Sequence, residues 1–156
     1  MIIIINQANL GFGWDEGPNL ATARVDPLCG MMTKEGKRFI LAVGGTSSTG
    51  EELTDCEYIE LPSIDKKISW PWKKCNDLPI PFSWAQLIED PETGDVLILG
   101  VQEKFAIYRL SEIEGEWILQ KETLMAPRQY FSALVVPAGI LNCDESSSKI
   151  DHHDEL

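Results

Sequence analysis

Residues 39–45, Phe-Ile-Leu-Ala-Val-Gly-Gly, form an apolar run that ends in a pair of glycines. A polar loop follows, then Tyr58 in a second apolar run and Trp70 in a third. A weaker copy comes next, with Val-Leu-Ile-Leu-Gly over 96–100, then Tyr108 and Trp117. The tyrosine recurs after 50 residues (58 to 108), the tryptophan after 47 (70 to 117) and the strand-ending glycine after 55 (45 to 100). A period near 50 built from short apolar runs indicates a repeat array.

Short β-strands separated by turn residues are predicted along the chain, and helical spacing is absent. The first unit comprises strands over 25–33, 38–43, 56–61 and 68–72, and the second comprises strands over 83–89, 95–99, 105–110 and 116–120. Further strands are predicted before and after them, including 1–6 and 130–136. We therefore predict an all-β fold with about two full four-stranded antiparallel blades of a partial β-propeller, over about 25–72 and 83–120, plus strands of flanking blades.

The repeated residues have structural roles in this prediction. The glycines that end the second strand of each blade, Gly44, Gly45 and Gly100, suit a crowded backbone with positive φ. The aromatic side chains would fill the space between blades; they are Tyr58, Trp70, Tyr108 and Trp117. Taken singly, such glycines are typical of ordinary turns and such aromatics of any core, so the recurrence in fixed order carries the prediction.

Composition excludes several functional classes. The net charge of −12 makes nucleic acid an improbable partner, because phosphate contacts need clustered Lys and Arg. No apolar run approaches the roughly 18 residues of a membrane span, so no membrane insertion is expected. Four cysteines (Cys29, Cys56, Cys75 and Cys143) form no Cys-x-x-Cys pair, which argues against a zinc or redox motif. They are buried small hydrophobes or, in an oxidising compartment, disulfide partners.

The string from Phe39 to Trp70 resembles a kelch repeat, with its hydrophobic strand, double glycine, and spaced tyrosine and tryptophan. Trp14, Gly17-Pro18 and Arg24 resemble the linker between kelch blades, and so does the segment 124–128. The second copy departs from the pattern, with Leu99-Gly100 for the glycine pair and no arginine after its linker, where Phe82 follows. The resemblance implies a ring of six or seven blades, of which residues 1–142 would be the C-terminal part. A rival hypothesis is that several short chains assemble into a ring.

The chain ends in His153, Asp154, Glu155 and Leu156, which is the HDEL signal for return to the endoplasmic reticulum. This ending predicts a retrieval receptor as one partner, bound through an acidic flexible tail over 143–156. It also predicts residence in the lumen of the endoplasmic reticulum if an upstream signal peptide exists, and in the cytoplasm otherwise. The alternative is a solvated acidic tail that matches the signal by chance.

Catalysis has little support in the sequence. Both histidines are adjacent in the tail, at 152 and 153, so no histidine can act as a base in the folded body. We expect no catalytic residue, metal or cofactor. The sequence predicts a non-catalytic kelch-type scaffold that binds an unidentified protein through the long loop, with candidate residues Thr46, Ser47, Ser48, Glu51, Glu52 and Asp55. The alternative is a scaffold fragment of a propeller enzyme whose catalytic residues lie in missing N-terminal blades.

Overall fold

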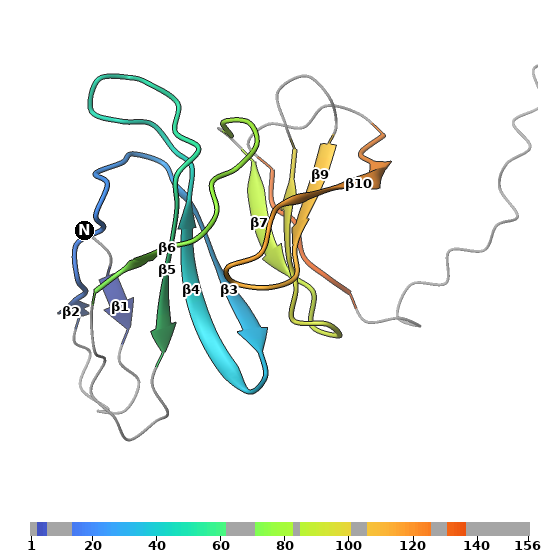
Figure 1. Cartoon of the computed structure of the whole chain (residues 1–156), viewed down its shortest axis with the longest axis horizontal. Helices are drawn as coiled ribbons and strands as arrows, with labels where there is room; N and C mark the ends of the chain where they lie inside the picture. The colour runs from blue at the N-terminus through green and yellow to red at the C-terminus, as the bar shows by residue number, and fades with distance from the viewer. Residues whose placement is uncertain are drawn as a thin grey trace, which may run out of the picture.

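A computed structural model of the chain describes residues 3–5, 14–61, 71–82, 85–100, 106–125 and 131–136. Over these residues the backbone forms ten strands, β1 to β10, and no helix (Figure 1). The strands make one two-stranded sheet and two four-stranded sheets, and every pairing within them is antiparallel. The predicted all-β class with two four-stranded antiparallel sheets is confirmed. Among the described residues no helix is long and apolar enough to cross a membrane.

The first large sheet contains β3 (Leu28–Lys34), β4 (Lys37–Val43), β5 (Cys56–Leu61) and β6 (Lys73–Lys74), paired in chain order. Glu35 and Gly36 form the turn between β3 and β4, and both have positive φ, at 50° and 74°. A two-residue turn of this kind matches the twist of the strands that it joins.

Two strand predictions in the first large sheet are wrong at their boundaries. The first strand begins at Leu28 instead of Val25, because Pro27 lacks the amide hydrogen that a ladder needs and Asp26 has φ of 50°. Val25 pairs instead with Thr46 in an isolated bridge. The fourth strand, predicted over 68–72, lies at Lys73–Lys74, and residues 71–72 are not in a strand. Trp70 lies outside the described residues.

The second large sheet contains β7 (Gln86–Glu89), β8 (Val96–Leu99), β9 (Ala106–Leu110) and β10 (Ile118–Thr123), again paired in chain order. The last strand runs to Thr123, beyond its predicted end at Gln120, because its register shifts between Leu119 and Thr123. Such an irregularity lets the strand continue past unpaired positions.

The flanks of the two sheets differ from the predicted pattern. β1 (Ile3–Ile5) pairs with β2 (Trp14–Glu16) in a short antiparallel sheet. The strand predicted over 130–136 is wrong for its described part, since residues 131–136 are not in a strand. Pro137 follows them directly, and a proline cannot donate to a ladder.

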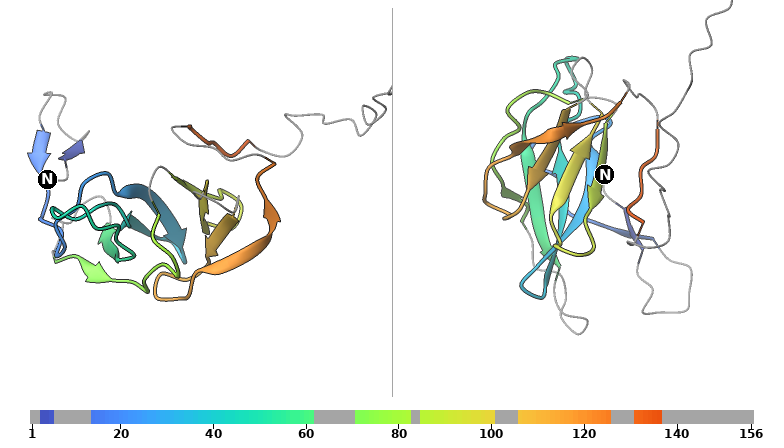
Figure 2. Two further views of the ribbon diagram at one scale, coloured as in Figure 1. Left: turned by 90° about the horizontal axis from the view of Figure 1, so that it is seen from above. Right: turned by 90° about the vertical axis from the view of Figure 1, so that its right-hand side faces the viewer.

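The two large sheets pack against each other (Figures 1 and 2). The edge strand β3 of one lies near the edge strand β7 of the other, and β6 and β10 form the opposite edges. Between them lies a continuous core to which both sheets contribute buried side chains; it includes Met32, Leu41, Tyr58, Phe82, Leu87, Ile98, Tyr108, Leu110 and Trp117. Gly30 on β3 leaves the space that the Leu87 side chain of β7 occupies. The smallest residue at this position therefore sets how closely the two sheets approach.

Asp95 fastens the sheets at the end where the turns of β3–β4 and β7–β8 meet. Its side chain is 5% exposed, and it accepts hydrogen bonds from Lys34 of the first large sheet and from Arg109 and Ser111 of the second. Burial alone raises the pKa of the Asp95 carboxyl, but these three donors outweigh it and hold the pKa below its usual value. The carboxylate therefore stays ionised and paired at neutral pH.

We predict that Asp95→Asn lowers the free energy of unfolding by about 2 kcal/mol at pH 7, because two cations lose their carboxylate. Since the folded pKa is depressed, this contribution is present above the unfolded pKa near 4 and is lost as the pH falls through the folded pKa. Urea unfolding at pH 7 and at pH 3 measures both values. An equal difference between wild type and variant at the two pH values would contradict this assignment.

Candidate functional site

The loop over 46–55, which connects β4 to β5, is held in one shape by its own hydrogen bonds. Thr46 pairs with Val25 on one side and with Glu52 on the other. The Ser47 hydroxyl accepts hydrogen bonds from the amides of Thr49 and Glu51, and the Ser47 amide donates to the Glu51 carbonyl at 2.8 Å. A loop with its backbone groups paired in this way presents its side chains in a fixed arrangement.

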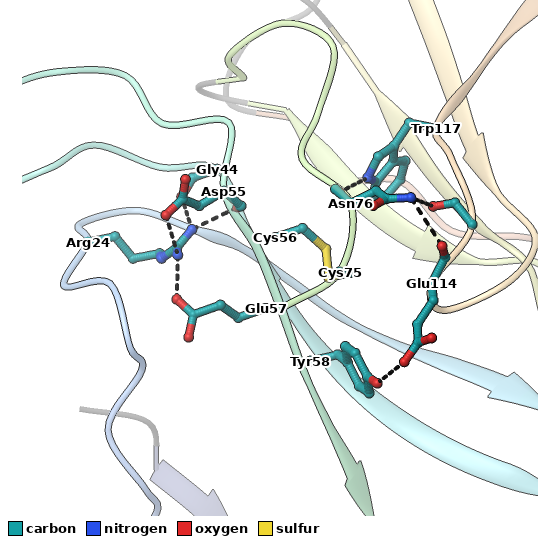
Figure 3. The surroundings of a disulfide bond; sticks show 11 residues. Arg24, Gly44, Asp55, Cys56, Glu57, Tyr58, Cys75, Asn76, Glu114 and Trp117 are labelled. Atoms are coloured by element: carbon teal, nitrogen blue, oxygen red, sulfur yellow. Dashed lines mark hydrogen bonds and ion pairs between the residues drawn. A yellow bond between two sulfur atoms is a disulfide. The ribbon is translucent and has the colours of Figure 1, made fainter. Parts of the chain in front are cut away.

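Arg24 lies under the base of this loop, and its side chain is completely buried (Figure 3). The guanidinium donates to the carbonyls of Gly44 and Asp55 at 3.0 and 2.9 Å and to the Glu57 carboxylate at 2.5 Å. A fourth acceptor is the Thr22 carbonyl, which accepts a hydrogen bond from Nε of Arg24 at 3.2 Å. The planar fork of arginine can satisfy several acceptors at once, which lysine cannot do.

Glu57 is the matching buried anion, on the face of β5 away from the second large sheet. It is 1% exposed, and besides Arg24 it accepts from the backbone amides of Ala21 and Thr22 at 2.7 and 3.0 Å. Its neighbours on this face form a small second core of Ala42, Ile59 and Trp72. A buried carboxylate is stable in such a place only when it is fully paired.

Gly44 and Gly45 bring the strand end close to this arrangement. Their φ values are 61° and 89°, and Gly100 at the end of β8 has 87°. A side chain on Gly45 would meet the backbone of Val25 and Pro27. These glycines thus permit a backbone approach that no other residue allows.

The structure separates the six candidate loop residues into two groups. Ser48, Glu51 and Glu52 are exposed at the tip of the loop, whereas Thr46, Ser47 and Asp55 are half-buried. Asp55 accepts a hydrogen bond from the Thr22 hydroxyl at 2.8 Å and lies 3.8 Å from the Arg24 guanidinium, so it supports the loop base.

We predict that Arg24→Met lowers the free energy of unfolding by about 3 to 5 kcal/mol, because Glu57 is left buried without its cation. The double variant with Glu57→Gln removes the unpaired charge, so part of the lost stability returns. Urea unfolding of the wild type, the two single variants and the double variant measures the coupling. Strictly additive losses would show that the two side chains do not interact.

A second group of polar contacts joins the two large sheets near β6 and β10 (Figure 3). The Tyr58 hydroxyl donates to the Glu114 carboxylate at 2.9 Å, and the Asn76 side chain donates to the Glu114 carbonyl at 3.1 Å. The Trp117 indole donates to the Asn76 carbonyl at 3.1 Å. Burial, the hydrogen bond to Glu114 and the charge of its carboxylate together raise the pKa of Tyr58 to about 12. The hydroxyl therefore remains a donor across the physiological pH range.

The two repeated tyrosines are not structural equivalents. Tyr58 lies opposite Leu41 on the face of the first large sheet that meets the second, and Tyr108 lies opposite Ile98 on the face of the second that meets the first. In the structure the glycine that matches Gly100 is Gly44, and not Gly45 as the spacing of 55 suggested, because β4 ends directly before Gly44 and β8 ends directly before Gly100. Leu41 is three residues before Gly44, whereas Ile98 is two residues before Gly100. An offset of one residue turns a strand position to the other face of the sheet. The tyrosines consequently enter one core from opposite sides, where Tyr108 packs edge-on against Phe82.

Cys56 and Cys75 form a disulfide between the start of β5 and the residue after β6. Their Cα atoms are 5.1 Å apart and both residues are buried, at 0% and 6% exposed. Cys29 is a free, exposed cysteine, and Cys143 lies outside the described residues. The sequence left the state of all four cysteines open, because spacing alone does not give connectivity.

Several residues of these networks were not identified from sequence, namely Glu57, Asn76, Asp95 and Glu114. A signal existed for Glu57, since an acid between Cys56 and Tyr58 in an apolar strand predicts a buried charge in need of a partner. Asn76 and Glu114 lie in turn-rich segments, where polar residues are the default and carry no such signal.

Other predicted features lie outside the described residues. They include Trp70, the two histidines and the signal His153–Leu156. Within the ranges that the structure describes, no group of three or more His, Cys, Asp or Glu side chains could hold a metal ion.

Comparison with known proteins shows a limited similarity. No protein-family model matches the chain. The chain is 32% identical over 94 residues to a protein of Neurospora crassa called tRNA wybutosine-synthesizing protein 4. This alignment covers 58% of the present chain and 8% of the length of the fungal protein. The chain thus corresponds to a small part of that relative.

Proposed function

We propose that this chain is a non-catalytic module of the kelch propeller type that binds a protein partner through the loop over 46–55. The observation that carries the proposal is the fixed loop with an exposed tip, formed by Ser48, Glu51 and Glu52. A rigid loop loses little conformational entropy on binding, which favours recognition. The two carboxylates suit a partner surface that presents Lys or Arg.

The propeller part of the proposal is supported by the far face of the second large sheet, the face that points away from the first. Ile88, Leu97, Leu99 and Ile107 lie on this face and are half-buried. Leu97 and Leu99 lie three residues and one residue before Gly100. Leu41 and Val43 have the same spacing before Gly44, and they lie on the face of the first large sheet that packs on the second. A further sheet packed there would repeat the same contact, as in successive propeller blades.

We expect that replacing the tip by Ser48→Ala, Glu51→Gln and Glu52→Gln together reduces partner capture at least tenfold, because the exposed contacts are lost. The unfolding midpoint in urea should change little, since these side chains are exposed. Quantitative pull-down from an extract of endoplasmic reticulum lumen, with chemical cross-linking, compares the variant with wild type. The matched control is Glu35→Gln, an exposed acid in the β3–β4 turn at the other end of the first large sheet. Equal capture by the tip variant and wild type would contradict the proposal.

Residence in the lumen of the endoplasmic reticulum is proposed from the final four residues and gains support from the Cys56–Cys75 disulfide. Disulfides persist in oxidising compartments and are rare in the cytosol. The proposed partner of the tail is the retrieval receptor.

The last six residues should retain a secreted reporter inside the cell when they form its C-terminus, because retrieval depends on a free terminal signal. The control carries Leu156→Ala, which alters the terminal residue alone. Fractions of reporter in cells and medium give the result. Equal secretion of the two reporters would show that the ending is not a signal.

A second candidate is a non-catalytic scaffold segment of a larger enzyme. It is favoured by the similarity to tRNA wybutosine-synthesizing protein 4, of which the matched part is a small fraction. In that case the catalytic residues would lie elsewhere in the longer protein. Determining the full-length transcript discriminates the two candidates, since an upstream catalytic segment would favour the enzyme.

A further inference from the structure

We propose that the Cys56–Cys75 disulfide is a redox site that fastens the interface between the two large sheets, so that reduction by a dithiol loosens that interface. This site is separate from the loop tip and does not depend on the proposed function. The inference rests on what the disulfide anchors and on the hollow that borders one of its two residues.

The disulfide holds a strand that has few other attachments. β6 comprises Lys73 and Lys74, both exposed, and pairs with β5 at two positions. Beyond this pairing, the Cys75 amide donates to the Cys56 carbonyl at 3.0 Å. A two-residue edge strand is marginal by itself. The covalent bond between β5 and the end of β6 is therefore the strongest restraint on its position.

The residue after the disulfide connects the two sheets. Asn76 donates through its side chain to the carbonyls of Glu114 and Gly115 and accepts from the Trp117 indole (Figure 3). Asn76 belongs to the connection that leads from the first large sheet, and the other three residues lie between β9 and β10. Any shift of Cys75 moves Asn76 with it, because the two are adjacent in the chain.

The same connection also supports the base of the loop over 46–55. The Leu78 amide donates to the Thr54 carbonyl at 2.9 Å, and Leu78 is 3% exposed in the core between the sheets. The disulfide thus restrains one segment, 75–78, that contacts both the second large sheet and the loop.

A hollow of about 500 Å³ lies beside Cys75 and is lined by Lys74, Cys75, Asn76, Asp77 and Glu114; Cys75 itself is 6% exposed. Cys56 is fully buried, so attack is directed to the Cys75 sulfur. A dithiol thiolate attacks this sulfur, the S–S bond breaks and Cys56 leaves as a thiolate that takes up a proton. The second thiol of the reagent then displaces Cys75, which gives two protein thiols and one oxidised dithiol. Burial of the leaving Cys56 makes the first step slow.

The test measures hydrogen exchange of the Trp117 indole by NMR, in oxidised protein and in protein reduced with dithiothreitol. We expect exchange to become at least tenfold faster on reduction, because the Asn76 carbonyl no longer holds the indole. Amides of Leu41 and Ile98 in the central strands should keep their protection, and the melting temperature should fall by about 10 °C. The indole resonance is assigned with Trp117→Phe.

Two variants separate the disulfide from other thiol effects. Cys29→Ser removes a free cysteine and should respond to dithiothreitol as wild type does. Cys75→Ser should show fast Trp117 exchange before any reagent is added and no further change after it. If this variant does not fold, the comparison of Trp117 exchange in oxidised and reduced wild-type protein decides the question. The proposal is overturned if Trp117 exchange is equal in oxidised and reduced wild type, or if peptide mapping of unreduced protein finds no Cys56–Cys75 link.

Discussion

Each of the two large sheets is apolar on both faces, and this constraint governs how the chain folds. The first large sheet buries Leu41, Val43 and Tyr58 on one side and Ala42 and Ile59 on the other. A single four-stranded sheet cannot cover two apolar faces, so it needs a neighbour on each side. The second sheet supplies one cover, and the segment with Leu20 lies against the other face. Stability therefore depends on covering both faces of each sheet, and the packing of the two large sheets on each other covers one face of each.

Polar residues then fix how the stacked sheets align. Asp95 joins them at the end where the β3–β4 and β7–β8 turns lie, and Asn76 with Glu114 joins them near β6 and β10. Apolar packing alone tolerates small slides between sheets, whereas hydrogen bonds at separate points define one arrangement. The buried pair of Arg24 and Glu57 extends the same principle to the loop over 46–55. The accessible tip is thus supported from below by charges that cannot move without large cost.

The sequence was sufficient for the class of fold and for most strands, because alternation and turn residues are local signals. β5 has the predicted bounds, and the Glu35-Gly36 turn lies between the strands predicted over 25–33 and 38–43. The predicted strand boundaries were wrong where pairing between distant residues sets the strand ends. Val25 bridges to Thr46 instead of continuing β3, and β6 pairs with β5 at only two residues. The two tyrosines illustrate the limit most clearly. Their spacing of 50 residues suggested that they are equivalent. Relative to Gly44 and Gly100, however, the two strand positions differ by one residue, so the two tyrosines lie on opposite faces of their sheets. Counting the period does not reveal this offset.

The candidate site divides in the same way. Exposure of Ser48, Glu51 and Glu52 followed from a polar loop of ten residues, which is a local property. The supporting role of Asp55 depends on Arg24, which is 31 residues away in the chain. The Cys56–Cys75 bond likewise depends on the hairpin that brings β5 and β6 together. Such contacts join residues that are distant in the chain, and local sequence patterns do not reveal them.

The convergence of Tyr58 and Tyr108 on one core between two sheets is the central claim, and NMR measurement of through-space contacts from their rings tests it most directly. The account predicts contacts from the Tyr58 ring to Phe39 and Glu114, and from the Tyr108 ring to Phe82. Contacts from the Tyr108 ring to Leu97 and Leu99 would place it on the far face of the second large sheet and would contradict the account.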